Sequence, residues 1–85
     1  MNVKENLAVL DKVLPVVVRV HGGNHPELSD IFSQYQEMKK KLEAGKDASE
    51  NAAAIEKLTN GFKLPDDACQ AYTKVYAALE AIIKK

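Results

Sequence analysis

Apolar residues recur at steps of three and four along every segment of this chain of 85 residues. That spacing is typical of one buried face of an α-helix, and no stretch alternates for long as a half-buried strand does. Only the run 16–20 (VVVRV) has the β-branched composition of a strand, so a strand is the alternative there. The sequence predicts an all-α fold, a small up-down bundle of about four helices that forms one domain over residues 1–85.

The first predicted helix ends at Gly22-Gly23, because glycine accepts the left-handed backbone of a helix C-terminus. Pro15 lies inside this helix and removes the backbone hydrogen bond to residue 11, so we expect a kink or a break into two pieces. Its inward face is predicted to carry Val3, Leu7, Leu10, Val13 or Leu14, Val17, and Val20 or His21.

The second predicted helix begins close behind the first. Asn24 or His25 caps it, and Pro26 suits its first turn, where the missing N–H costs nothing. Asn24 and Glu27 have the spacing of a capping box, and Gly45 ends the helix. Its inward face carries Leu28, Ile31, Phe32, Tyr35, Met38 and Leu42. Because the link is so short, we expect the first two helices to form an antiparallel hairpin.

Two further helices are predicted in the second half. A capping-box pattern at Asp47 and Glu50 starts a short, alanine-rich helix that ends at 60–61 (Asn-Gly). Pro65 marks the start of the last helix, with Asp66 and Asp67 favoured by the helix dipole. The inward face of this helix carries Ala68, Tyr72, Val75, Leu79 and Ile82, widened by Cys69, Tyr76 and Ile83.

Charge and cysteine content limit the classes of function. Twelve basic and twelve acidic side chains cancel, so the basic excess typical of a nucleic-acid-binding protein is absent. Cys69 is the single cysteine, so no disulfide forms within the chain, which fits a reducing compartment. The sequence has no apolar run of the roughly 18 residues that cross a membrane, and its start lacks a signal-peptide pattern. We therefore expect a cytoplasmic protein that binds neither nucleic acid nor membrane.

One loop carries a resemblance to a known family. Residues 20–28 read VHGGNHPEL. This segment resembles the V-H-G-x-x-H-P-E-L loop of the hemerythrin-like iron–sulfur-cluster repair proteins, which joins the first two helices of a four-helix di-iron bundle. The resemblance covers roughly residues 7–50. It implies a hemerythrin-related helical hairpin, followed by two helices that match no family pattern.

The family's iron ligands do not carry over to this sequence. The family's first-helix His would fall at or before Met1, and its H-x-x-x-E pair would fall on Gly45 and Ser49. The second half of the chain contains no His. The resemblance therefore implies a scaffold without the di-iron centre, and the expected cofactor is none, with iron as the alternative.

His21 and His25 are the two remaining candidates for a metal site. Imidazoles four residues apart on a helix can share an ion, with Cys69 or Glu27 as a further ligand. The glycines between them interrupt the helix, so the spacing does not guarantee that the rings converge. The structural interpretation is that each imidazole bonds exposed backbone groups of the turn. Metal binding stays an alternative.

No catalytic group is predicted. Cys69 near a helix N-terminus has the position of an activated thiol, but its apolar neighbours Ala68 and Tyr72 favour a small buried core residue. Asp66 and Asp67 at a helix start are typical partners of the dipole rather than an acid–base pair. We therefore expect that the protein is not an enzyme.

The favoured function is that of a non-catalytic helical module acting by association, as a homodimer or with another helical protein. A hairpin derived from half a bundle can complete its core with a second copy. The interaction surface is predicted on the last helix, at Tyr72, Val75, Tyr76, Leu79 and Ile83, with a contribution from Tyr35 and Met38. The alternative is a metal-binding or redox accessory protein in iron–sulfur repair or nitrosative stress, using His21 and His25.

Overall fold

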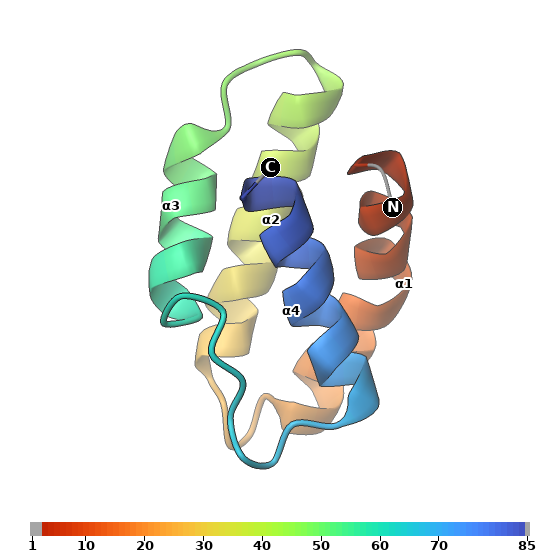
Figure 1. Cartoon of the computed structure of the whole chain (residues 1–85), viewed down its shortest axis with the longest axis vertical. Helices are drawn as coiled ribbons and strands as arrows, with labels where there is room; N and C mark the ends of the chain where they lie inside the picture. Colours follow the sequence, from red (N-terminus) through yellow and green to blue (C-terminus); the bar gives the residue numbers. More distant parts are fainter. Residues whose placement is uncertain (1–2, 85) are drawn as a thin grey trace.

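The computed structural model describes residues 3–84 and contains four α-helices (Figure 1). They are α1 (Val3–His21), α2 (Glu27–Glu43), α3 (Ser49–Leu58) and α4 (Gln70–Ile83). No strand occurs within the described residues, and the β-branched run 16–20 lies inside α1. The prediction of a small all-α bundle with one short helix is confirmed.

The helices alternate in direction along the chain, so that α1 and α4 lie antiparallel side by side, as do α2 and α3 (Figure 1). A shorter contact between α1 and α2 joins the two pairs. Apolar side chains from all four helices meet in one core. Its largest fully buried members are Tyr35, Tyr72, Leu10, Leu14, Leu28, Ile31, Met38, Ile55 and Leu79.

Glycines end the helices for two different physical reasons. Gly45 follows α2 with left-handed backbone (φ 71°), and the predicted pair Asn60 and Gly61 follows α3 with left-handed backbone at both residues (φ 52° and 73°). Gly22 has no left-handed φ, so the predicted reason is wrong there. A Cβ at Gly22 would collide with the carbonyl oxygen of Val18, and glycine is needed because the turn folds back so closely.

The helix starts correct three local predictions. Pro26 is the N-cap of α2 without a side-chain bond, and the Asn24 N–H donates to the His21 carbonyl, so no capping box forms. The predicted capping box of Asp47 and Glu50 does not form before α3. Asp47 instead bonds the residue two positions on, since the Ser49 N–H donates to Asp47 Oδ1 over 3.0 Å. The last helix begins at Gln70 rather than near Pro65, because the intervening residues form a turn and then an extended N-cap.

Pro15 does not divide the first helix, which continues as one helix from Val3 to His21. One turn before the proline, α2 is bonded to α1. The Tyr35 hydroxyl lies 2.7 Å from Asp11 Oδ1, and Lys39 Nζ lies 2.5 Å from Asp11 Oδ2. Partial burial opposes ionisation of Asp11, but these two donors outweigh it and hold the pKa of its carboxyl below the usual value. The contact fixes the α1–α2 pair beside the proline.

The prediction of an exposed interaction surface on the last helix is wrong, because the structure buries nearly all of its residues. Tyr72, Val75 and Leu79 are fully buried in the chain's own core, Tyr76 is 4% exposed, and Ile83 is half-buried. The contributors from α2, Tyr35 and Met38, are each 1% exposed. These side chains are covered because α4 lies with its wide apolar face directly on α1 and the α2–α3 pair.

Candidate functional site

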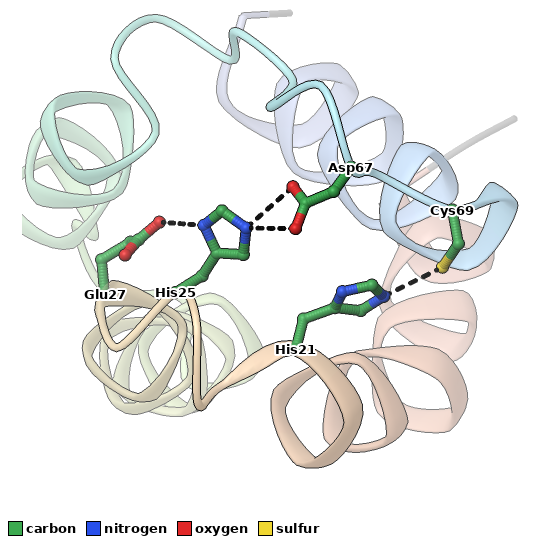
Figure 2. A network of polar contacts seen from close by, with 5 residues as sticks. All are labelled: His21, His25, Glu27, Asp67 and Cys69. Atoms are coloured by element: carbon green, nitrogen blue, oxygen red, sulfur yellow. Dashed lines mark hydrogen bonds and ion pairs between the residues drawn. The ribbon is translucent and has the colours of Figure 1, made fainter.

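The segment that carries the sequence motif forms the turn between α1 and α2. The backbone N–H groups of Asn24 and His25 both donate to the carbonyl of His21, over 3.1 and 2.9 Å. Because one carbonyl accepts both hydrogen bonds, the chain reverses direction just after α1 ends. The segment that leads into α4 crosses the same end of the bundle, and Figure 2 shows the side chains that meet there.

His25 lies between two carboxylates. Its Nε2 donates to Asp67, with 2.9 Å to Oδ1 and 3.0 Å to Oδ2, and its Nδ1 lies 3.4 Å from Glu27 Oε2 (Figure 2). The hydrogen bond to Asp67 raises the pKa of the His25 imidazole, and the charge of Glu27 adds to this. The same bond lowers the pKa of the Asp67 carboxyl. The His25 side chain therefore bridges the start of α2 and the segment before α4.

His21 does not join His25 but faces the thiol of Cys69. His21 Nε2 lies 3.3 Å from Cys69 Sγ, from the last turn of α1 to the N-cap of α4 (Figure 2). The prediction that Cys69 is a buried core residue is wrong, because its side chain is exposed. As the N-cap, Cys69 lies at the rim of the bundle, and the apolar face of α4 begins only behind it.

Tyr72 lies beneath both histidines. Its ring meets His21 edge-on at 5.1 Å between centroids, His25 at 5.7 Å and Tyr76 at 5.2 Å. Such edge-to-face contacts are favourable for aromatic rings. Burial raises the pKa of the Tyr72 hydroxyl, and the neighbouring Tyr76 hydroxyl raises it further. The Tyr72 oxygen makes no hydrogen bond of normal geometry to a described residue. The two imidazoles thus cover the Tyr72 ring at the end of the bundle and present their polar atoms outward.

The two histidines have separate partners, and their side chains do not converge on one point. Within residues 3–84, no group of three or more His, Cys, Asp or Glu side chains has the arrangement needed to hold a metal ion. The arrangement can hold a proton at His25 and present a thiol at Cys69. The acids Asp66 and Asp67 do not form a pair, since Asp66 is exposed and Asp67 turns to His25.

A second feature lies along the outer side of α1. Val16 is 41% exposed and Val20 is 65% exposed. Nearer the N-terminus of α1, a groove of about 440 Å³ lies between α1 and α4. The groove is lined by Asn6, Val9, Lys74, Ala77, Ala78 and Ala81. Because its walls are mostly apolar, this groove can cover an apolar side chain of another molecule.

Sequence reasoning missed two elements of these sites. Asp67 was assigned to the helix dipole, and nothing in the local pattern indicates a bond to His25, which is 42 residues away. The exposed valines Val16 and Val20 were not recognised. A signal exists, because they continue the repeat of the half-buried Val9 and Val13 at steps of four, three and four.

In comparisons with family models, curated proteins and solved structures, nothing matched this chain. The structure itself adds one finding about class: none of the helices within residues 3–84 is long and apolar enough to cross a bilayer. The fold and the site therefore define a small all-α protein with a histidine–carboxylate contact at one end and an apolar groove along one side.

Proposed function

We propose that this chain is a non-catalytic helical module that acts in the cytoplasm by association, with a second copy or with another helical protein. The outward valines of α1 carry the proposal. Val16 and Val20 expose apolar surface on α1, and nearer the N-terminus of the same helix lies a groove that α4 lines with alanines. Burying such surface is favourable by about 25 cal/mol per Å², so a partner helix would be stabilised there. The surface differs from the one predicted on the buried face of α4.

We also propose that the chain is a relative of the hemerythrin-like repair proteins without a di-iron centre. Two observations support this. The motif segment 20–28 lies in the turn of an antiparallel α1–α2 hairpin, the place it has in that family. The positions that would hold the H-x-x-x-E pair, Gly45 and Ser49, lie at the end of α2 and the start of α3 and offer no imidazole or carboxylate.

The association proposal is tested by the mass of the protein in extracts of cells that produce it. We expect the wild-type chain to elute well above the mass of a monomer, and the variant Val16→Glu/Val20→Glu to elute as a monomer. A matched control, Ser33→Glu/Lys40→Glu, changes exposed residues of α2 and should elute as the wild type does. A wild-type chain that elutes as a monomer, in extract and in sedimentation equilibrium at high concentration, would contradict the proposal.

A second function, that of a metal-binding or redox accessory protein, is favoured by one contact. His21 Nε2 and Cys69 Sγ lie 3.3 Å apart at the protein surface, and both are ligand types that Zn²⁺ and iron accept. The test is titration with Zn²⁺ or Fe²⁺ of the wild type and of Cys69→Ser and His21→Ala. Tight binding of one ion per chain that both variants lose would support this function, and no binding would exclude it.

A further inference from the structure

The proposed function does not say what kind of molecule the partner is. The residues of the groove indicate its chemical class. We propose that the groove between α1 and α4 binds one amphipathic helix of another protein, with apolar residues inward, a polar residue opposite Asn6, and acidic residues along both flanks. This inference rests on the proposed association function. It is carried by three features of the groove: the spacing of its apolar residues, the buried amide of Asn6, and the charge of its rims.

The spacing indicates that the partner is a helix. From Asn6, the residues of one face of α1 follow at steps of three, four, three and four, through the half-buried Val9 and Val13 to the exposed Val16 and Val20. A sustained step of three and four is the seam along which one helix packs against another. On the α4 side, Ala77 and Ala81 are exposed and small, so the backbone of a third helix can approach closely. The groove and the valines beyond it therefore form a face on which a further helix can pack.

Asn6 indicates that the face of the partner helix that enters the groove carries a polar residue. Its side chain is 4% exposed, lines the groove, and makes no hydrogen bond to any described residue. A helix docked in the groove would remove the remaining contact of the amide with water. A buried amide without a partner is costly, so the docked helix must offer a donor and an acceptor at this level. One Asn or Gln at an inward position of a coiled coil serves this role and fixes the register.

The exposed charges beside the groove, and beside the valines that extend beyond it along α1, are mostly basic. Lys12 and Arg19 flank the valines along α1, and Lys74 lines the groove on α4. All three are exposed, and none has an ion pair with a described residue. Glu5 holds the corresponding flank position beside Asn6 and is the single acid along that flank of α1. Opposite charge on the partner thus complements most of the rim.

The same charges argue against a second copy of this chain. A two-fold contact through the groove would bring the rim of one copy against the identical rim of the other. Lysine and arginine side chains would then face like charges across a newly buried seam, which is unfavourable. An acidic helix satisfies the apolar seam and the rims together, so it is the occupant that the groove favours.

The test uses a synthetic helical peptide of about three heptads, with Leu at inward positions except for one Asn, Glu on both flanks, and one Trp. Because the chain itself contains no Trp, emission of the peptide reports binding. We expect the Glu-flanked peptide to bind about tenfold more tightly than the same peptide with Lys flanks, with the difference shrinking at high salt. Lys12→Glu/Arg19→Glu should reverse the preference, while Lys57→Glu on α3 should leave it unchanged.

Asn6 is tested with a peptide in which Leu replaces the inward Asn. The wild type should bind the Asn peptide more tightly, and Asn6→Leu should bind the Leu peptide more tightly. Equal binding of Glu-flanked and Lys-flanked peptides, or no binding of either, would overturn the inference. The proposed function has a separate readout. If neither peptide binds but Val16→Glu/Val20→Glu still releases a complex in extracts, the chain associates and its partner is not an acidic helix.

Discussion

His25 Nε2 and Asp67 Oδ1 lie 2.9 Å apart, although 42 residues separate them along the chain. The bond ties the turn between α1 and α2 to the segment that precedes α4 (Figure 2). From Leu64 to Ala68, the backbone hydrogen bond of this segment is that of one turn, in which the Ala68 N–H donates to the Pro65 carbonyl. A side-chain contact therefore fixes the path by which the chain enters its last helix.

The His25–Asp67 contact predicts a pH-dependent stability. The pKa of His25 is raised in the folded protein above its usual value of 6.5, so the stabilisation is complete below that value. It is lost as the pH rises through the raised pKa, because the imidazolium then becomes neutral. We expect the melting temperature of the wild type to exceed that of His25→Gln by more at about pH 5.5 than at about pH 8.5.

The control for this prediction is Asp67→Asn, which should return the pKa of His25 towards its ordinary value in a titration followed by NMR of the ring protons. Asp66→Asn, one residue earlier and exposed, should leave that pKa unchanged. A gap in melting temperature that is constant with pH, or that grows as the pH rises, would show that the ion pair contributes nothing to stability.

Removal of the Tyr72 hydroxyl is predicted not to destabilise the protein. The hydroxyl oxygen is buried and makes no hydrogen bond of normal geometry to a described residue, so the Tyr76 hydroxyl, which acts on the pKa of Tyr72, recovers little of the cost of desolvation. We expect Tyr72→Phe to leave the free energy of unfolding unchanged or to raise it by up to about 1 kcal/mol. Tyr35→Phe is the matched control, since that hydroxyl donates to Asp11, and it should lower the free energy by about 1–2 kcal/mol. Urea unfolding of both variants gives the comparison, and equal losses would contradict it.

Replacement of Pro15 should stabilise the protein. The proline is exposed in the interior of α1 and has no N–H to offer the Asp11 carbonyl. Pro15→Ala restores that donor, and after the greater entropy of the unfolded chain is subtracted we expect a gain of about 1–2 kcal/mol. Pro26→Ala, at the N-cap of α2, removes no helical bond and should give no such gain. Thermal unfolding measures both, and a loss of stability in Pro15→Ala would refute this account.

The purified protein is predicted to be colourless and to contain no stoichiometric iron. The positions that correspond to the family's ligand pair are Gly45 and Ser49, and His21 and His25 have different partners. Metal analysis and an absorption spectrum of protein from iron-rich medium provide the measurement. One or two irons per chain, with oxo-to-iron absorption, would establish a di-iron site and would remove the proposal of a scaffold without iron.

The sequence alone was sufficient to predict the four helices and most of their ends. Helix formation depends on local spacing of apolar residues. Gly45 ends α2 and Asn60 with Gly61 ends α3, because glycine, and asparagine among residues with a side chain, adopt a positive φ more readily than other residues. Helix starts were predicted less well. Asn24 and Asp66 have the composition of capping residues, but their backbone belongs to turns that are fixed by other parts of the chain.

Only the tertiary structure decided which polar side chains meet and which apolar faces are covered. His21 reaches Cys69 and His25 reaches Asp67 because the crossing of two distant segments places them together, and no local pattern encodes that crossing. The same holds for the surface. The sequence marks two apolar faces, one along α4 and one along the outer side of α1, but the packing of α4 buries the first and leaves Val20 of the second 65% exposed. Local periodicity determines that a helix has an apolar face, whereas the position of every other helix determines whether that face meets protein or water.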